Sequence, residues 1–279
     1  MWSDAAVWVP WALWTAYGDR GVLEEQFASM TGHARAASQQ ASPNGLWDTA
    51  FQFGDWLHPD ASPERPWDAK VDKHVVATLC AYGTASLVAA AADVLGDAAA
   101  SAEFGAMAQA LQAAFAGHYV SDGVITSDCT TVYALAIVFG ILGAADRESA
   151  GRRLAELVEQ SGFRISVTDA LTDTGHLDVA YRLLLQTENP SWLYSVTMDA
   201  TTTWERWDSM LPDGTINPGE MTSFNHYALG AVVDWMHRTI GGLAPLEPGY
   251  RRILMAPQPG GGLEWAETSL ETPLGFASV

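Results

Sequence analysis

Apolar segments of helical length follow one another in pairs through the first 240 residues, and this pairing constrains the fold more than any other feature. Breaks of a few residues separate the members of a pair, as at Gly96-Asp97 and at Gly143. Glycine closes helices because it readily adopts the left-handed conformation. Two helices joined by a short break form an antiparallel hairpin. The expected helices are residues 4–18, 19–40, 71–95, 98–116, 128–142, 147–160, 174–186 and 223–240.

The sequence changes character after Pro245. Short segments that alternate or are apolar are separated there by turn residues such as Pro259-Gly260-Gly261-Gly262. This spacing predicts antiparallel strands, and no convincing alternating strand precedes it. We therefore expect an all-α domain over residues 1–244 and a partial antiparallel β-domain over residues 245–279. The expected strands are residues 250–256, 263–270 and 276–279.

The formal charge of −19 excludes partners that need a basic surface. Only 14 residues are Lys or Arg, against 33 Asp and Glu. Nucleic acids and anionic membranes attract a clustered basic patch, so we expect neither as a partner. No segment is expected to span a membrane, and no N-terminal pattern is typical of a signal peptide. A cytoplasmic location is the default expectation, and the oligomeric state stays open.

The two cysteines, Cys80 and Cys129, do not suggest a disulfide or a metal site. Cys80 lies in an apolar helical pattern with Val75, Val76 and Leu79, which favours a buried thiol. No CxxC motif and no cluster of Cys and His residues indicates zinc. We expect neither a metal nor another cofactor.

A carboxylate, a guanidinium and two indoles are adjacent in the four residues Trp204, Glu205, Arg206 and Trp207. An unpaired buried charge is costly, so this cluster is poorly suited to a core. Indole faces cover the apolar side of a sugar ring, and a carboxylate can act as a general acid, a general base or a nucleophile. We interpret Glu205 as a catalytic carboxylate of a glycosidase.

Three further clusters of polar and aromatic residues occur near expected helix starts, at residues 4–11, 54–56 and 225–227. Helical hairpins in series can form a bundle, a solenoid or a closed toroid of inner and outer helices. No fixed-period repeat is visible, which counts against a solenoid. A toroid would gather these clusters where the loops of its inner helices meet.

Each cluster also has a purely structural interpretation. Asp4 and Asp55 are suited to cap helices. Trp204 and Trp207 lie three residues apart and are suited to packing on one helix face. His226 is suited to a structural hydrogen bond. Hydrolysis of a glycoside normally needs two carboxylic groups, and the sequence nominates Glu205 for one role and no equally suited residue for the other.

Several segments, taken in order, form a signature that extends well beyond Glu205. They are WSDAAVWVPWALWTAYGD, FQFGDWL, TTVYALAIVFGIL, DVAYRLLLQTENPSWLYSV, TTTWERWDS, MTSFNHYALGAVVDWMHRTIGGL and PGYRRILMAPQPGGGLEWAETSLETPLG. Together they resemble the bacterial α-L-rhamnosidases, glycoside hydrolase family 78. WSDA resembles the family's Trp-x-Asp-Ala segment, and FQFGDWL resembles its Gly-Asp-Trp-Leu loop. The resemblance covers nearly the whole chain.

The resemblance implies a mainly α fold, an (α/α)6 toroid followed by an antiparallel β-sandwich. It also implies inverting, metal-independent removal of terminal α-L-rhamnose from an oligosaccharide or glycoside. Glu205 matches the general base that activates water, Arg206 is expected to hold Glu205 ionised, and Asn225 to support His226 by hydrogen bonding. The residues expected to hold or wall the sugar are Asp4, Trp11, Asp55, Trp56, Trp204 and His226.

The chain departs from the family's pattern at its ends. The family's general acid lies in an Asp-x-x-x-Arg-Asp-Glu-Arg-like motif N-terminal to the Trp-x-Asp-Ala segment, whereas this sequence starts at Met1-Trp2-Ser3-Asp4. We therefore expect an incomplete toroid with the general acid outside this chain. A non-catalytic or vestigial carbohydrate-binding fragment is the alternative. An unsaturated glucuronyl hydrolase is disfavoured, because Arg206 is the main group available to receive a substrate carboxylate.

Overall fold

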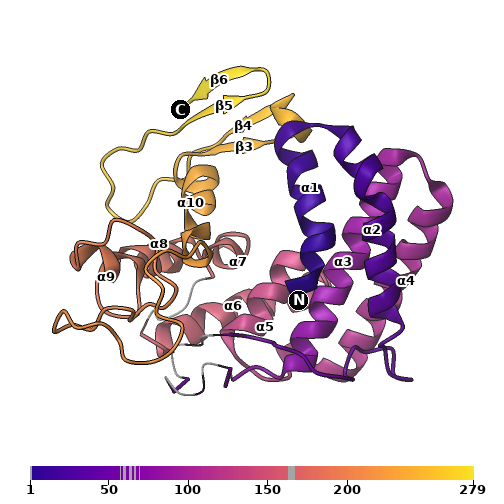
Figure 1. The fold of residues 1–279 in the computed structure, drawn as a ribbon, viewed down its shortest axis with the longest axis horizontal. Helices are drawn as coiled ribbons and strands as arrows, with labels where there is room; N and C mark the ends of the chain where they lie inside the picture. Colours follow the sequence, from indigo (N-terminus) through magenta and orange to yellow (C-terminus); the bar gives the residue numbers. More distant parts are fainter. Residues whose placement is uncertain are drawn as a thin grey trace.

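Pairs of antiparallel helices form most of the protein (Figure 1). The computed structural model describes residues 2–56, 58, 61, 62, 65, 67, 68, 70–162 and 167–279. The helices of the first 200 residues are η1 (Trp2–Asp4), α1 (Ala5–Tyr17), α2 (Arg20–Ser38), α3 (Lys73–Leu95), α4 (Ala98–Tyr119), α5 (Thr130–Phe139), α6 (Ala144–Gln160), α7 (Thr168–Thr172), α8 (Leu177–Leu185) and α9 (Trp192–Thr197). Between residues 223 and 250 follow η2 (Ala228–Ala231), α10 (Val232–Trp235), η3 (Met236–Ile240) and η4 (Pro248–Tyr250).

Inner and outer helices alternate along the chain. The inner helices contact one another in the order α1, α3, α5, α7 and α10. The outer helices pack behind them, α2 on α1 and α3, α4 on α3, α6 on α5 and α7, and α8 on α7. In Figure 1 the helices follow an arc that runs from α10 through α7 and α5 to α3 and α1. The expected mainly α fold, a toroid of helical hairpins, is confirmed.

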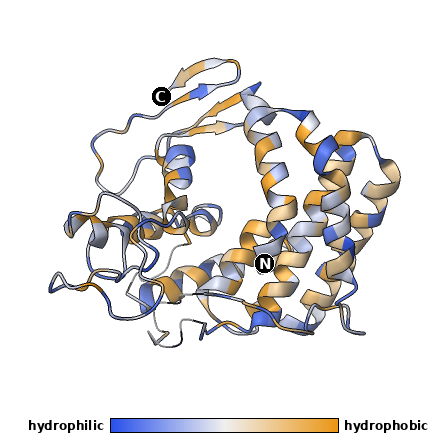
Figure 2. Ribbon diagram, in the orientation of Figure 1, coloured by the Kyte–Doolittle hydropathy of each residue, from blue (hydrophilic) through white to orange (hydrophobic). Residues whose placement is uncertain are grey.

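The long inner helix α3 shows why these segments form a toroid. It is apolar on all sides rather than along one stripe (Figure 2), and its buried residues point in every direction. A helix that is apolar all round must be covered all round. By length and composition α3 could cross a membrane, so the expectation that no segment reaches this length is wrong. However, 72% of its most apolar window is buried inside the protein, which identifies a core helix.

Local signals in the sequence set the helix ends. Asp72 caps α3, because its carboxylate accepts a hydrogen bond of 2.9 Å from the His74 amide. Asp97 caps α4 in the same way through the Ala100 amide. Gly96 ends α3 in the left-handed conformation, with φ of +79°. These are the cap residues that helices generally prefer.

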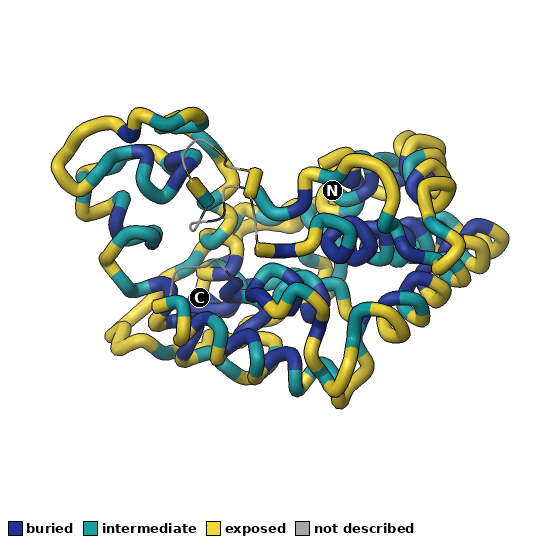
Figure 3. The backbone as a smooth tube through the Cα atoms, turned by 90° about the horizontal axis from the view of Figure 1, so that it is seen from below, coloured by how far each residue is buried: buried dark blue, intermediate teal, exposed yellow. Residues whose placement is uncertain are grey.

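The buried residues are concentrated in the helices, whereas the loops and the last thirty residues are mostly exposed (Figure 3). The largest core cluster joins α3, α5, α6, α7 and α8, and a second joins α1, α2, α3 and α4. Cys80 and Cys129 are free and buried, so the expected buried thiol at Cys80 is confirmed. Burial raises the pKa of Cys80 to about 12, which makes this thiol unreactive at neutral pH.

The expected long helix over residues 223–240 is broken, and this prediction was wrong in its first turns. Residues 223–227 form a loop, followed by the short elements η2, α10 and the π-turn η3. The His226 amide donates to the Thr203 carbonyl at 2.8 Å instead of to a helical carbonyl. Pairing with a distant segment therefore replaces the first turn of the helix. Apolar periodicity does not report such pairing.

The helix that follows this loop is anchored deep in the toroid. Trp235 of α10 is fully buried, and its indole N–H donates to the Thr172 hydroxyl of α7 at 2.9 Å. Its ring meets Tyr181 of α8 edge-on at 5.7 Å. The Tyr181 hydroxyl in turn donates to the Gln258 carbonyl at 2.6 Å. These contacts fix the position of the loop that carries His226.

Short antiparallel strands occupy the C-terminal region. β3 (Leu243–Pro245) pairs with β4 (Ile253–Met255), and β5 (Ser269–Thr272) pairs with β6 (Gly275–Ser278). The expected antiparallel strands after residue 245 are thus present, although the segment predicted at 263–270 becomes a strand only at Ser269. A short hairpin of two-residue strands, β1 (Val120–Ser121) paired with β2 (Val124–Ile125), was not predicted. Strands this short show no alternation in sequence.

Gly242 allows β3 to lie close to the segment after β4, and we expect substitution there to be damaging. Its φ is +70°, and an added Cβ would lie 2.1 Å from the Pro257 nitrogen. Gly262 has a φ of +75° but open space around its Cβ position, so Gly262→Ala is a matched control. Gly262→Ala should lower the free energy of unfolding by about 1 kcal/mol, and Gly242→Ala by about 3 kcal/mol. Thermal unfolding measures both, and equal losses would contradict the close approach.

Candidate active site

Two segments that are distant in sequence, one carrying Glu205 and the other His226, pair through their backbones. The Glu205 amide donates to the Ser223 carbonyl at 2.9 Å, and the His226 amide donates to the Thr203 carbonyl at 2.8 Å. The Thr202 hydroxyl also donates to the Phe224 carbonyl. The clusters predicted around Glu205 and His226 therefore share one structural unit, which we call the Glu205 hairpin (residues 202–226).

The Glu205 carboxylate is held by the backbone that faces it. The Ser223 amide donates to Oε2 of Glu205 at 3.1 Å. The side chain is half-buried, so it is oriented by the protein and still reachable from solvent. A carboxylate that is held in one direction without being neutralised by a cation is suited to accept a proton from water.

His226 presents a hydrogen-bond donor on the same hairpin. Its Nδ1 accepts a bond of 3.3 Å from the Ala228 amide. In the neutral imidazole the proton is then carried by Nε2, which becomes a donor. The ring is half-buried and stacks on Tyr227 at 5.2 Å. This arrangement is suited to donate to a sugar hydroxyl.

An aromatic cluster links the start of α1 to the loop before α3. Trp2 stacks on Phe53 at 4.4 Å, and both meet Trp56 edge-on at 5.7 and 5.8 Å. Trp56 also reaches the Glu205 hairpin, because its indole N–H lies 3.3 Å from the Met221 sulfur. Trp2 is 53% exposed, so part of this apolar surface is open to a ligand.

The Gly54-Asp55 turn holds Trp56 in place. Gly54 is buried and has a φ of +67°, and an added Cβ would lie 2.6 Å from Cγ of Lys73 at the start of α3. Only glycine fits this position without displacing Lys73. The Asp55 carboxylate accepts a hydrogen bond of 2.8 Å from the Thr131 hydroxyl of α5. The loop is therefore tied to two inner helices.

Asp4 does not meet the expectation of a sugar contact, because it is completely buried. Its Oδ1 accepts hydrogen bonds from the Thr84 hydroxyl at 2.9 Å and from Nε2 of His33 at 2.8 Å. The Trp8 indole donates to the same Thr84 hydroxyl at 3.1 Å. Asp4 thus connects α1 with α2 and α3, which is a structural role.

Trp11 and Trp204 also pack within the protein. Trp11 lies about two turns further along α1 than Asp4 and packs against the core cluster formed with α2 and α3. Trp204 is 4% exposed, and its ring meets Tyr194 and Phe224 edge-on. Trp204 stabilises the Glu205 hairpin by packing against these two rings.

Arg206 pairs with a different carboxylate from the one expected. Its Nε lies 2.9 Å from Oδ1 of Asp208, and its Nη2 lies 3.3 Å from Oδ2. The sequence led us to expect that Arg206 holds Glu205 ionised, whereas the carboxylate that Arg206 binds is that of Asp208. Asn225 is exposed, and its backbone N–H donates to the Ser223 hydroxyl at 3.1 Å.

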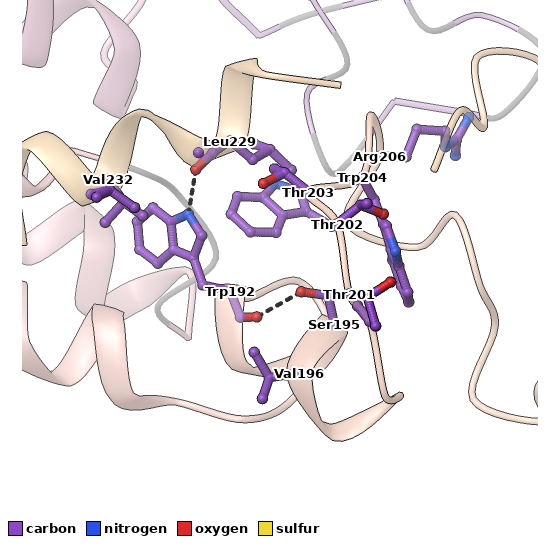
Figure 4. Close-up of a pocket in the computed structure, with 14 residues that line it drawn as sticks. Trp192, Ser195, Val196, Thr201, Thr202, Thr203, Trp204, Arg206, Leu229 and Val232 are labelled. Carbon is purple, nitrogen blue, oxygen red and sulfur yellow. Dashed lines mark hydrogen bonds between the residues drawn. The ribbon is translucent and has the colours of Figure 1, made fainter. Parts of the chain in front are cut away.

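A cavity of about 300 Å³ lies beside the Glu205 hairpin, between α9 and α10 (Figure 4). Trp204, Arg206 and Trp207 line it, but Glu205 does not. No carboxylate lines the cavity. Its walls are indole, threonine and valine side chains, such as Trp192, Thr202 and Val233. We therefore place the candidate chemistry with Glu205 and not in this cavity.

Sequence reasoning missed four residues that the structure places at the site. Trp2 and Phe53 complete the aromatic cluster, and Met221 and Ser223 connect the hairpin to Trp56 and Glu205. Trp2 stands in the Trp-x-Asp-Ala segment, which was an available signal. Met221 and Ser223 act through a thioether and a backbone amide, which carry no sequence signature. Among the described residues, no group of three His, Cys, Asp or Glu side chains could hold a metal ion.

Comparison with known proteins assigns both parts of the chain to described families. The family described as bacterial alpha-L-rhamnosidase 6 hairpin glycosidase domain matches residues 1–240, and the bacterial alpha-L-rhamnosidase C-terminal domain matches residues 242–279. An alpha-L-rhamnosidase of Streptomyces avermitilis is 42% identical over 287 aligned residues, covering 100% of this chain and 27% of that protein. One of Formosa agariphila is 34% identical, with 98% of this chain and 30% of that protein covered.

Solved structures show the same fold. The native rhamnosidase of Aspergillus terreus superimposes with a TM-score of 0.93 at 39% identity, covering 99% of this chain and 33% of that one. The Streptomyces avermitilis alpha-L-rhamnosidase complexed with L-rhamnose gives a TM-score of 0.89 at 38% identity, covering 99% of this chain and 26% of that one. The chain thus spans about a quarter to a third of the length of these relatives.

Proposed function

Because this chain belongs to the bacterial α-L-rhamnosidases, glycoside hydrolase family 78, we propose that it forms part of the catalytic domain of an enzyme that removes terminal α-L-rhamnose from glycosides. The observation that carries the proposal is the Glu205 hairpin. It holds a half-buried carboxylate beside a histidine donor and reaches Trp56 through Met221. A carboxylate that can activate water and aromatic rings that can cover a sugar are two of the groups that glycoside hydrolysis uses, and a second carboxyl group completes the set.

In the proposed reaction Glu205 acts as the general base. The Ser223 amide directs the carboxylate, which takes a proton from a water molecule as the water attacks the anomeric carbon. Attack by water on the face opposite the leaving group inverts the anomeric configuration. The general acid, which protonates the leaving oxygen, is assigned to a residue outside residues 1–279.

The sugar itself would be held by the groups around the carboxylate. Trp56 and Trp2 offer apolar ring surface to the sugar, and Nε2 of His226 offers a donor to a hydroxyl. Asp55 offers a carboxylate acceptor beside Trp56. The substrate class is a rhamnose-containing oligosaccharide or glycoside, as supported by the L-rhamnose complex of the Streptomyces avermitilis relative.

A non-catalytic carbohydrate-binding role is the second candidate. It is favoured by one observation, that none of the described residues lining the cavity beside the Glu205 hairpin is a carboxylate. Under this alternative the aromatic cluster and His226 would bind rhamnose without turnover. Calorimetric titration with L-rhamnose combined with an activity assay separates the two functions.

The decisive experiment uses 2,4-dinitrophenyl α-L-rhamnoside, whose leaving group needs little protonation. Release of dinitrophenol by the chain supports the enzyme, and rhamnose binding without release supports the binding module. Proton NMR at early times then identifies the product. β-L-rhamnose as the first anomer supports inversion, and α-L-rhamnose as the first anomer would contradict it.

Trp56→Ala should weaken binding of L-rhamnose about two- to tenfold, because an aromatic contact contributes about 0.5–1.5 kcal/mol. Trp265→Ala is the matched control, since Trp265 is 79% exposed in the C-terminal region. Calorimetry of both variants against the unaltered chain measures the effect. Equal dissociation constants for the two variants would remove Trp56 from the proposed sugar site.

A further inference from the structure

A buried polar network crosses the interior of the Glu205 hairpin. Asp208 is its centre, because Oδ1 and Oδ2 accept from Arg206, and Oδ2 also accepts from Nδ2 of Asn217 at 2.8 Å. Nη1 of Arg206 lies 3.4 Å from the Glu220 carbonyl, on the returning arm of the hairpin. The Asn217 side chain in turn accepts from the Gly219 amide at 2.8 Å. One guanidinium and one carboxylate therefore connect both arms.

Most of the network is enclosed by the protein. Arg206 is 9% exposed and Asn217 4% exposed, while the Asp208 side chain is 31% exposed. Ser209 is fully buried, and its hydroxyl both accepts from the Arg206 amide and donates to the Arg206 carbonyl at 3.2 Å. The planar guanidinium binds a carboxylate through two parallel bonds, which fixes direction as well as distance. A hydrogen-bonded network whose guanidinium is buried favours one conformation of the chain around it.

The returning arm between Asn217 and Ser223 carries both contacts that serve the candidate site. Met221 touches the Trp56 indole, and the Ser223 amide holds the Glu205 carboxylate. Met221 has a φ of +61°, a conformation that non-glycine residues rarely adopt. Such a conformation persists only where its surroundings hold it. The network supplies that support, because Arg206 binds Glu220, the residue immediately before Met221.

We propose that Arg206, Asp208 and Asn217 are positioning residues, which set the direction of the Glu205 carboxylate and the distance of Trp56 through the arm that contains Met221 and Ser223. In this role Arg206 acts on Glu205 through the backbone and not by charge. The catalytic consequence rests on the proposed function, whereas the structural consequence does not. Loss of the network should loosen the open end of the hairpin, which contains Glu205, Ser223 and His226, while the tip of the hairpin stays formed.

The hairpin tip provides a matched control for this test. Asp213 accepts from the Thr215 amide at 2.9 Å and from the Thr215 hydroxyl, and the Leu211 amide donates to the Thr215 carbonyl at 2.8 Å. These contacts are local to the tip. Asp208→Asn and Asp213→Asn are therefore the same chemical change at two levels of one hairpin.

Amide hydrogen exchange of the whole chain, measured residue by residue by NMR, gives the direct readout. In Asp208→Asn the amides of Glu205, Ser223 and His226 should exchange at least tenfold faster, with the amides of α3 unchanged. In Asp213→Asn only the tip amides should accelerate. The proposal would be overturned if the amides of Glu205, Ser223 and His226 exchanged at an unchanged rate in Asp208→Asn. It would also be overturned if they exchanged faster only to the same extent as the amides of α3. If Asp208→Asn unfolds the chain, Asn217→Ala replaces it, because it removes only one of the hydrogen bonds to Asp208 and no charge, and the same exchange pattern is expected.

Kinetics test the catalytic consequence separately. With 2,4-dinitrophenyl α-L-rhamnoside, Asp208→Asn should lower kcat about 10- to 100-fold, as expected for a displaced general base, with KM raised by at most the factor found for Trp56→Ala. Asp213→Asn should leave both unchanged. If a variant kept full kcat although the amides of Glu205, Ser223 and His226 exchanged faster, the network would not position Glu205 for catalysis. If the unaltered chain shows no turnover, the proposed enzymatic function fails, and hydrogen exchange alone still decides whether the network holds the hairpin.

Discussion

Glu205→Gln is expected to reduce hydrolysis of an activated rhamnoside about 10²- to 10⁴-fold. Glutamine keeps the shape of glutamate, and its side-chain oxygen can still accept the 3.1 Å hydrogen bond from the Ser223 amide. It cannot take a proton from water. The hairpin should therefore stay formed while the chemical step is lost, so kcat should fall and L-rhamnose binding should change little.

The control for Glu205 is Glu264→Gln, an exposed glutamate in the C-terminal region. This variant should match the unaltered chain in kcat and KM. Calorimetry with L-rhamnose shows whether Glu205→Gln still binds the sugar. Equal kcat values for the two variants would show that Glu205 is not the base.

Asp4→Ala should destabilise the protein by about 3 kcal/mol or more, as expected when one partner of a buried pair is removed. The substitution leaves the Thr84 hydroxyl and Nε2 of His33 without the Asp4 carboxylate that accepts from both. Asp19→Ala is the comparison, because Asp19 caps α2 at an exposed position through the Gly21 amide. Loss of such a cap costs about 1 kcal/mol. Urea unfolding of both variants measures the difference.

Asp4→Asn separates the two roles that Asp4 was given. If Asp4 is structural, this variant should bind L-rhamnose with nearly the original affinity at temperatures where it is folded. Unchanged stability together with lost binding would restore Asp4 as a sugar contact. Its complete burial favours the structural role.

Features that depend on neighbouring residues were predictable from the sequence. The helix pairs, the glycine stop at Gly18 and the break at Gly96-Asp97 appear where the sequence pattern places them. The change to antiparallel strands after Pro245 was also predictable, because turn residues and alternation are local signals. The Glu205 cluster stood out because charges and indoles in immediate succession are poorly suited to a core.

Features that depend on distant residues were not predictable. The apolar pattern of residues 223–240 suited a helix, yet its first turn is lost to pairing with residues 202–205. Aromatic residues lie close to Asp4 and to Asp55 in the sequence, so the two carboxylates have similar sequence contexts. Only the packing of α2 and α3 around Asp4 distinguishes a buried hydrogen-bonding residue from a loop carboxylate.

The sequence by itself determined that this chain forms helical hairpins, which carboxylate is the best candidate base, and which family the chain resembles. Tertiary structure alone decided the partners of each polar group. Arg206 is adjacent to Glu205 in sequence but binds Asp208, and Glu205 takes its hydrogen bond from Ser223. The physical reason is directional. A side chain's neighbours in sequence fix its place along the chain, but the direction in which it points, and so the group it meets, is set by how distant segments pack.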